Sequence, residues 1–332
     1  MTLPKVSIII VNYNGKLLLE KCLESLFKIN YNNFEVVIVD NNSTDNTIEF
    51  ITKNYPSIII IKLDSNKGFA EPNNIAAKIT KGDYLLFLNN DTIVTPNFIS
   101  EMIKTMENDK KIGICQSLLL KSDGQIDSSG DFMDDLGIVY NSKTKIDSTR
   151  EIFSARGASL IILKNIFDNL GGFDEKFFFS FEDVDLSWRV RINGYKILVV
   201  QTSIVHHLGG GTSDKISSDL TFHSVKNQIS MKITNFETYL VVKVLFLFLL
   251  RYGFREIKIL FDYIINGKTT ITSTNYEDKI AAKPNIRGIL KGMFWLFSNI
   301  PYLFTKHRSV NKMRKISTDE FKKTGLMTRK IK

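Results

Sequence analysis

The first apolar run of the chain is VSIIIVN, at residues 6–12, and its valine and isoleucine content predicts a strand buried on both faces. Three similar runs follow, at residues 34–40, 57–63 and 84–89. Between the runs, apolar residues recur at helical spacing, as at Leu19, Leu23 and Leu26. This alternation predicts an α/β fold, in which helices cover both faces of a mostly parallel sheet.

Polar residues follow each of these strands. They are grouped at residues 12–14, 40–43, 66–74 and 89–92. Ligands of open parallel sheets bind at the carboxyl ends of the strands, so we expect the groups to form one site. Gly68 allows a close backbone approach, and the amides of Asn73 and Asn74 can hydrogen-bond to a base or ribose. Helix capping by the asparagine and serine side chains is the alternative interpretation of each single group.

Carboxylates lie among aromatic residues in GGFDEKFFFSFEDVDLSWR, residues 171–189. Burial and a neighbouring acid both raise the pKa of a carboxyl, which makes it a usable general base. The alternative is a helix over residues 182–193 whose first turn is acidic, because acids there interact favourably with the helix dipole. In that helix Asp185 stands four residues before Arg189, which predicts an ion pair on the helix surface.

The composition is that of a soluble globular protein, with 43% hydrophobic and 24% charged residues among 332. The net charge of +9 is concentrated at the end of the chain, where residues 283–332 carry 13 Lys or Arg against Asp319 and Glu320. Charge alone suits anionic lipid or nucleic acid equally well.

Two cysteines, Cys22 and Cys115, lie far apart, which argues against a disulfide framework or a zinc site. The chain enters its first apolar run after residue 5, without the charged segment and cleavage site of an export signal. We therefore expect a cytoplasmic protein.

Apolar residues return at 239–250 and 292–304, interrupted or flanked by Lys243, Lys291 and Lys306. Each run is shorter than the roughly 20 residues of a membrane-spanning helix, so the sequence favours amphipathic helices in the membrane interface. Packing on the catalytic domain or on another chain is the alternative. We expect a catalytic domain at residues 1–222 and a helical, basic, membrane-associating region at residues 223–332.

The motifs, in this order, resemble the rhamnosyltransferase-like branch of the family 2 glycosyltransferases. The resemblance covers roughly residues 6–213, and it implies the GT-A fold that binds nucleotide sugars. Its elements are VSIIIVNYN (6–14), VDNNSTD (39–45), NKGFA (66–70), LNNDT (88–92), RGA (156–158), GGFDE (171–175), EDVDL (182–186) and HHLGGG (206–211).

The resemblance implies a divalent metal, Mg²⁺ or Mn²⁺, on the diphosphate of the donor. The family usually carries Asp-x-Asp after the fourth strand, whereas this chain has Asn89, Asn90 and Asp91, so its first carboxylate is an amide. Asp91 and His207 are the implied metal ligands, since carboxylate and imidazole both suit such a cation.

The resemblance also assigns residues to the donor and to the chemistry. Asp40 would contact the base or ribose, and the other residues expected to bind the donor are Asn12, Asn14, Asn66, Gly68, Asn74, Asn89, Gly157 and Ala158. Asp183 would be the catalytic base that takes the proton of the acceptor hydroxyl, giving inversion at the anomeric carbon. Glu182 and Asp185 would shape the acceptor site.

The expected function is therefore that of an inverting hexosyltransferase. It would move rhamnose or another hexose from a nucleoside diphosphate to a glycan or lipid-linked acceptor, in cell-surface polysaccharide synthesis at the cytosolic face of the membrane. One alternative is a sugar-nucleotide nucleotidyltransferase, although NYNGK at residues 12–16 lacks the glycine-rich loop of such enzymes. The other is a non-catalytic protein that binds a sugar nucleotide or nucleic acid. Basic residues beside apolar helices disfavour nucleic acid.

Overall fold

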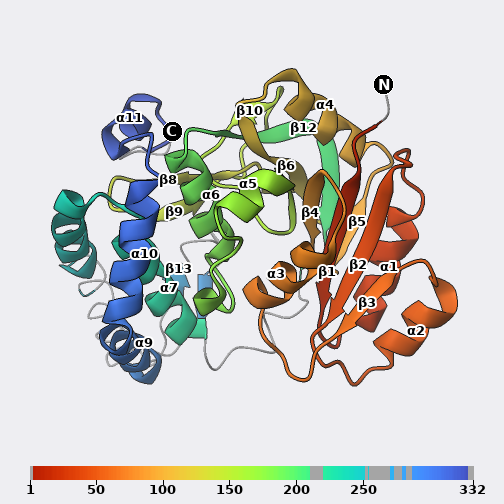
Figure 1. Ribbon diagram of the computed structural model, residues 1–332, viewed down its shortest axis with the longest axis horizontal. Helices are drawn as coiled ribbons and strands as arrows, with labels where there is room; N and C mark the ends of the chain where they lie inside the picture. The colour runs from red at the N-terminus through yellow and green to blue at the C-terminus, as the bar shows by residue number, and fades with distance from the viewer. Residues whose placement is uncertain are drawn as a thin grey trace. The chain divides into compact units, whose positions relative to one another are not determined.

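The computed structural model describes residues 3–209, 220–250, 253, 270–272, 279–281 and 286–327 (Figure 1). The chain forms two compact units. The first contains residues 1–130 and 142–217, and the second contains residues 131–141 and 218–332. The chain thus enters the second unit briefly at residues 131–141, an excursion that the sequence patterns do not indicate.

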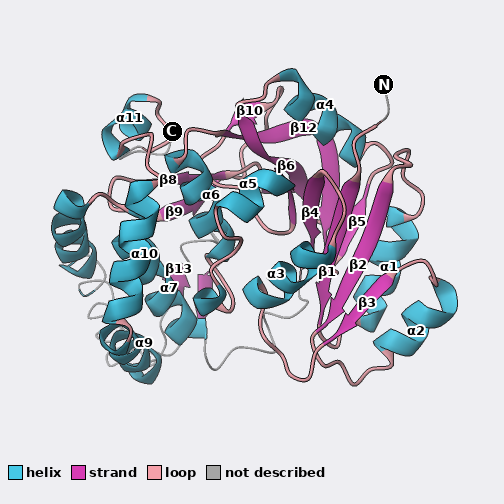
Figure 2. Cartoon of the chain, viewed as in Figure 1, coloured by secondary structure: helices cyan, strands magenta, loops and turns pink. Residues whose placement is uncertain are grey.

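A ten-stranded sheet forms the centre of the first unit (Figure 2). Its main path runs β10-β12-β6-β11-β4-β1-β2-β3, with β5 paired to β12 and β7 paired to β6. The strands are β1 (Val6–Asn12), β2 (Phe34–Asp40), β3 (Ile59–Lys62), β4 (Tyr84–Leu88), β5 (Thr92–Val94), β6 (Ile112–Leu120), β7 (Ile126–Ser128), β10 (Arg150–Glu151), β11 (Ser159–Leu163) and β12 (Lys196–His207).

The first four strands confirm the predicted parallel arrangement. β1 pairs in parallel with β2 and β4, and β2 pairs in parallel with β3. The predicted strands at residues 6–12 and 34–40 have those bounds, whereas the third is shorter than the predicted run 57–63. β11 is antiparallel to both β4 and β6. The sheet is therefore mostly parallel with an antiparallel insertion near its centre.

Helices cover the sheet on both faces. They are α1 (Lys16–Leu26), α2 (Thr47–Asn54), α3 (Ala70–Ile79), α4 (Phe98–Asn108), α5 (Lys164–Asn169) and α6 (Glu182–Ile192). Ile8 and Ile10 of β1 share one buried cluster with Leu19 and Leu23 of α1. Ring contacts join Phe87 of β4 to Phe167 and Phe173. Successive residues of β1 and β4 are buried, as strands covered on both faces require.

The second unit is mainly helical. It contains α7 (Leu220–Asn235), a helix over residues 238–250, α9 (Ile286–Ser298), α10 (Ile300–Lys312) and α11 (Thr318–Lys323). β8 (Asp131–Met133) pairs in antiparallel with β9 (Val139–Asn141), and β13 (Thr270–Thr272) pairs in antiparallel with β14 (Lys279–Ala281). Ile138 packs in one apolar cluster with residues of α7, α9 and α10, and Met133 forms a β-bridge with Met327. These contacts place residues 131–141 in this unit.

The two apolar runs of the second unit form helices. Residues 239–250 lie within the helix 238–250, whereas residues 292–304 are divided between α9 and α10. Among the residues that the structure describes, no helix combines the length and the apolar content that crossing a membrane requires.

Candidate active site

Asn12, at the carboxyl end of β1, joins three of the predicted polar groups. Its Nδ2 lies 3.3 Å from Ser43 Oγ and 3.2 Å from Thr47 Oγ1. Its Oδ1 accepts a 2.6 Å hydrogen bond from Asn90 Nδ2. Asn14 has a φ of 49° and accepts a 2.7 Å hydrogen bond from the backbone N–H of Thr44. The carboxyl ends of β1, β2 and β4 therefore form one hydrogen-bonded edge, as predicted.

Asp40, the last residue of β2, is buried at this edge. Its Oδ2 accepts a 3.0 Å hydrogen bond from the backbone N–H of Ser43. Its Oδ1 is buried and has no hydrogen-bond partner among the described residues. Leaving a buried carboxylate oxygen unsatisfied is costly, so this atom is suited to a donor group of a bound ligand.

The loop with Asn66 and Gly68 lies against the segment that precedes α6. Gly68 has a φ of +79°, and a Cβ there would lie 2.2 Å from the carbonyl oxygen of Phe178. The N–H of Phe69 donates a 2.6 Å hydrogen bond to the same oxygen. Asn66 Oδ1 accepts a 2.9 Å bond from the N–H of Gly68. Glycine is therefore required here for two reasons, the positive φ and the nearby carbonyl.

Asn74, on α3, uses its amide to hold the turn at residues 171–173. Its Nδ2 donates to the carbonyl of Phe173 at 2.8 Å, and its Oδ1 accepts from the N–H of Phe173 at 2.9 Å. Nδ2 also lies 3.1 Å from Glu175 Oε1. These contacts support a positioning role for Asn74 and give no support to the predicted contact with the donor.

Glu182 and Asp183 begin α6, and the chain enters that helix through an unusual backbone. Phe178, Ser180 and Phe181 have φ values of 62°, 71° and 69°. Such conformations cost residues other than glycine of order 1–3 kcal/mol each, and they cluster at functional sites. The segment before the predicted base is therefore strained.

Asp183 is held by two backbone N–H groups. Its Oδ2 accepts a 2.9 Å hydrogen bond from Gly157, and its Oδ1 accepts a 2.8 Å bond from Val184. Ala158 in turn accepts a 3.1 Å bond from the N–H of Asn89 at the end of β4. The Arg-Gly-Ala motif therefore fixes the carboxylate of Asp183 relative to the predicted donor edge.

The two acids of α6 have different environments. Burial raises the pKa of Asp183, but the N–H of Gly157 and the charge of Arg156 oppose that rise. Burial also raises the pKa of Glu182 well above its ordinary value, and the charge of Asp183 raises it further. Glu182 Oε2 has no hydrogen-bond partner among the described residues. The surroundings of Asp183 therefore stabilise its ionised form more than those of Glu182 do, so Asp183 is the better placed of the two to accept a proton.

Asp185 and Arg189 form the predicted ion pair, but not on a surface. Their closest N–O distance is 2.8 Å, and each side chain is only 1% exposed. Arg189 also donates 2.9 Å hydrogen bonds to the carbonyls of Leu170 and Gly172. The prediction of a surface pair was wrong because α6 is buried from Val184 to Ile192. The pair stabilises the glycine turn that precedes the helix.

Asp91 and His207 lie together where β5 pairs with β12. His207 Nε2 is 3.4 Å from Asp91 Oδ1, and the N–H of Leu208 donates a 2.9 Å bond to the carbonyl of Asp91. The other ring nitrogen, Nδ1, lies 2.9 Å from Asp127 Oδ2. Burial alone would lower the pKa of His207, but Asp127 and Asp91 raise it to about 9. Gly210 and Gly211 of the predicted glycine run lie outside the described residues.

Asp91 and His207 suit a divalent cation that takes most of its ligands from phosphate and water. Asp91 Oδ1 is buried and accepts no hydrogen bond within the described part of the chain. No cluster of three or more His, Cys, Asp or Glu side chains there has the arrangement of a metal site. Asp91 and His207 would thus hold the metal as a pair, with phosphate oxygens and water completing the coordination.

Asp127 is the site residue that sequence reasoning missed. It lies on β7, a strand of three residues within a region whose function no sequence motif indicated. Asp127 and His207 are 80 residues apart in the sequence and meet through the pairing of β7 and β12 with β6, so no local motif indicates their contact.

Comparisons with known proteins identify the family and the fold of this chain. Residues 7–171 match the family model for glycosyl transferase family 2. The O-antigen biosynthesis protein RfbC of Myxococcus xanthus is 30% identical over 221 residues, which are 61% of this chain but 17% of that protein. An N-acetylglucosaminyl-diphospho-decaprenol L-rhamnosyltransferase of Mycobacterium tuberculosis is 24% identical over 65% of this chain and 80% of its own length.

Among solved structures, GalNAc-T7 with UDP, GalNAc and Mn²⁺ is similar at a TM-score of 0.58 and 19% identity, over 71% of this chain and 49% of that one. This likeness shows the fold, which is the GT-A fold of nucleotide-sugar transferases. On the match over residues 7–171, the chain belongs to glycosyl transferase family 2.

Proposed function

We propose that this protein transfers rhamnose or another hexose from a nucleoside diphosphate sugar to a hydroxyl of a glycan or lipid-linked acceptor. The observation that carries the proposal is the placement of the carboxylate of Asp183. The N–H of Gly157 donates a hydrogen bond to this carboxylate. The next residue, Ala158, accepts a hydrogen bond from the N–H of Asn89 at the end of β4. A positioned base and a polar donor edge are the two parts that glycosyl transfer requires.

In the proposed reaction, Asp183 accepts the proton of the acceptor hydroxyl. The oxygen of that hydroxyl forms a bond to the anomeric carbon while the bond from this carbon to the diphosphate oxygen breaks. The electron pair of the broken bond leaves with the nucleoside diphosphate, so the transfer inverts the anomeric centre. Glu182, whose pKa is raised by burial and by the charge of Asp183, borders the acceptor side.

Donor binding is proposed for the sheet edge. Asp40 Oδ1 would accept a hydrogen bond from the base or ribose, and Asn12 and Asn14 would hold the surrounding polar network. Asp91 and His207 would hold Mg²⁺ or Mn²⁺. When bound, the cation supplies positive charge that offsets the negative charge developing on the departing diphosphate.

A lipid-linked acceptor also implies contact with a membrane. The name of the Mycobacterium tuberculosis relative specifies an acceptor on diphospho-decaprenol. We propose that this chain contacts the cytosolic face of a membrane peripherally, since no described helix could cross it.

The test is a screen of nucleoside diphosphate sugars for release of nucleoside diphosphate, with a membrane lipid extract as acceptor. The wild type should release product from one donor in the presence of Mn²⁺, and EDTA should stop the release. Undiminished turnover in EDTA would remove the metal from the mechanism. If no donor either reacts or binds, the chain is not a transferase of this kind.

A further inference from the structure

Helix α9 carries large apolar side chains on two faces. Leu296 is buried in the cluster that joins α9 to α7 and α10, and Met293 packs against that cluster. Leu290, Phe294 and Phe297 are 63%, 74% and 67% exposed. The spacing of four and then three residues places these three side chains on one stripe. A helix of a globular protein normally buries one apolar stripe, so the second stripe requires a second apolar partner.

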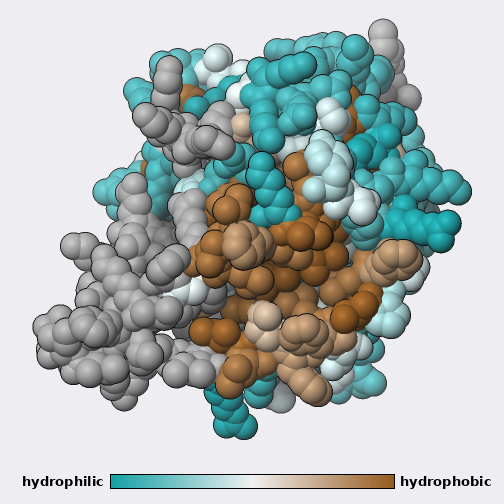
Figure 3. Space-filling model, turned by 90° about the vertical axis from the view of Figure 1, so that its left-hand side faces the viewer, coloured by the Kyte–Doolittle hydropathy of each residue, from teal (hydrophilic) through white to brown (hydrophobic). Residues whose placement is uncertain are grey.

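The neighbouring helices repeat this arrangement. In helix 238–250, Val244 and Phe248 are buried, whereas Val242 is 77% and Phe246 63% exposed. On α10, Leu303 is buried, and the exposed apolar side chains are Ile300 and Phe304. Figure 3 shows a broad apolar area on this side of the molecule. Exposed apolar groups gathered over several helices mark an interaction site.

The charges of these helices are all of one sign. Residues 238–250 and 286–312 contain no Asp or Glu. Their Lys and Arg residues are Lys243, Arg287, Lys291, Lys306, Arg308 and Lys312. A second copy of the same face would bring like charges together, which is unfavourable. An anionic bilayer offers apolar chains below negative headgroups, and each basic residue near such a surface contributes about 1 kcal/mol.

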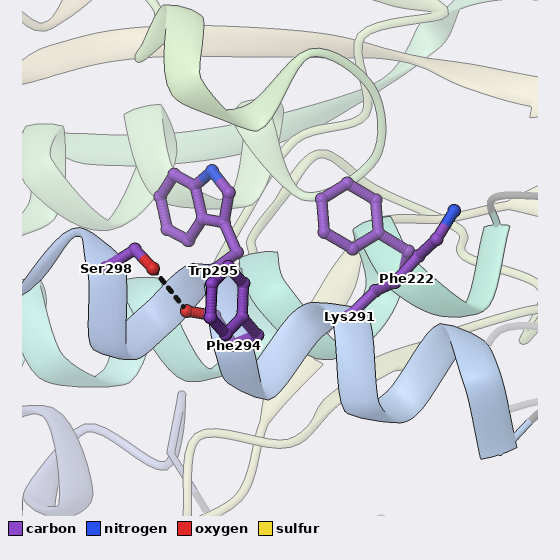
Figure 4. A pocket seen from close by; sticks show the side chains of 5 residues that line it. All are labelled: Phe222, Lys291, Phe294, Trp295 and Ser298. Carbon is purple, nitrogen blue, oxygen red and sulfur yellow. Dashed lines mark hydrogen bonds between the residues drawn. The ribbon is translucent and has the colours of Figure 1, made fainter.

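A pocket between α7 and α9 has the same character. It has a volume of about 300 Å³ and is lined by Phe222, Lys291, Phe294, Trp295 and Ser298 (Figure 4). The ammonium group of Lys226 makes cation–π contacts with two of these rings. Its Nζ lies 4.9 Å from the Trp295 ring centroid and 5.3 Å from that of Phe222. Aromatic walls beside an ammonium group suit an amphiphile with an apolar chain and an anionic head.

We propose that the exposed apolar side chains of helix 238–250, α9 and α10 insert into the headgroup region of an anionic bilayer. We call this surface the apolar face. The proposal rests on the membrane contact proposed above and names the residues that make it. Basic residues on the same helices then pair with lipid phosphates, and the pocket takes part of one lipid molecule.

The test uses the full chain and vesicles of phosphatidylcholine with or without 30% phosphatidylglycerol. Wild type should float with the anionic vesicles and bind the neutral ones less. The double variant Phe294→Ser/Phe297→Ser should reduce the partition coefficient by about tenfold or more. Leu17→Ser is the matched control, because Leu17 is 75% exposed on α1 of the other unit and its replacement should leave vesicle binding unchanged.

Each of the following results would overturn the proposal. They are unchanged binding by the double variant, equal losses in the control, and a wild-type dimer in light scattering that the double variant converts to a monomer without any vesicle binding. Nucleoside diphosphate release with a water-soluble acceptor is measured in parallel. If the wild type releases nucleoside diphosphate but does not bind vesicles, the proposed role of the apolar face is wrong and the proposed transferase activity stands. If it binds vesicles but releases no nucleoside diphosphate, the role of the apolar face stands and the proposed activity is wrong.

An independent observation concerns Asp127. Its Oδ2 lies 2.9 Å from Nδ1 of His207, on the opposite side of the ring from Asp91. A hydrogen bond from Nδ1–H to a carboxylate fixes both the tautomer and the ring orientation of a histidine, and leaves Nε2 free to bind a metal. Asp127 is 6% exposed, so it is held in place by its surroundings.

We infer that Asp127 is a positioning residue, which acts on the metal through His207 and does not bind the metal itself. Removing such a partner typically weakens metal binding 10- to 100-fold. Asp127→Ala should therefore raise the Kd for Mn²⁺, measured by electron paramagnetic resonance with UDP present, by about tenfold or more. Asp127→Asn keeps the size and an acceptor oxygen, so it should fold and show a smaller loss.

A double-mutant cycle separates this role from direct ligation. If Asp127 acts through His207, Asp127→Ala should cause no further loss of Mn²⁺ affinity in a His207→Ala background. Additive losses would show that Asp127 acts independently and would overturn the inference. The readout is Mn²⁺ binding, so it stands whether or not a donor sugar has been identified.

Discussion

The two units of the molecule hold different kinds of side chain in unfavourable environments. At the sheet edge of the first unit, carboxylates such as Asp40, Asp91 and Glu182 are buried beside an apolar core. In the helical second unit Lys232 is buried, while phenylalanines such as Phe294 are exposed. Buried polar groups without hydrogen-bond partners are suited to bind a ligand or to accept a proton. Exposed apolar groups are suited to contact with a membrane or with another apolar surface. This contrast supports the two proposals above, that the first unit carries out the transfer and that the second attaches to a membrane.

The largest effect should come from Asp183→Asn. If this variant kept its activity, the proposal that the first unit carries out transfer through Asp183 would be wrong. The amide cannot accept the hydroxyl proton, so kcat should fall by about 10²–10⁴-fold. Donor binding, measured by calorimetry, should stay within a few fold. Because burial raises the pKa of Asp183, the wild-type rate should fall at acid pH sooner than an ordinary aspartate would allow.

Glu182→Gln is the matched control for that experiment. It removes the neighbouring acid and keeps the volume, so it should lose less activity than Asp183→Asn. Equal losses of turnover and donor affinity in Asp183→Asn would show that Asp183 is structural.

The second prediction concerns the buried ion pair of Asp185 and Arg189. Asp185→Ala leaves the guanidinium of Arg189 buried without its carboxylate, and breaking a buried pair in this way costs about 3–5 kcal/mol. The free energy of unfolding in urea should fall by that amount. Any protein that remains folded should bind the donor normally, and a selective loss of turnover at unchanged stability would instead place Asp185 in the reaction.

The sequence predicted the parts of this site that depend on local patterns. β1 and β2 end at Asn12 and Asp40 as expected, because an apolar run that meets polar residues specifies both the strand and its end. It did not predict contacts that depend on burial or on the sheet order. Asp185 and Arg189 have the spacing of a surface pair, and only the packing around α6 shows that they are buried. Asp127 meets His207 through strands far apart in the sequence.

The third prediction tests how closely the donor loop and the base segment are joined. Gly68→Ala would place a methyl group 2.2 Å from the Phe178 carbonyl at a φ of +79°. Strain and displacement together should cost about 2–3 kcal/mol of stability, measured by urea unfolding, and should reduce turnover. Gly124→Ala is the control, since its φ is +82° but nothing lies within 4 Å of the added carbon. A similar cost in both variants would assign the effect to φ alone.

The last prediction tests the second unit through Lys232. Burial lowers the pKa of Lys232 to about 7, although Asp134 opposes that change, and Nζ lies 4.1 Å from the Phe248 ring centroid. Between pH 7 and about 10.5 the unfolded chain then binds a proton that the folded chain does not, so stability should rise with pH by up to about 1.4 kcal/mol per unit. Lys232→Met should remove that slope in urea unfolding, whereas Lys243→Met, which replaces an exposed lysine, should retain it. If the free energy of unfolding of Lys232→Met still rises with pH as in the wild type, this lysine keeps its proton in the folded state. The second unit would then bury a charge, as the first one does.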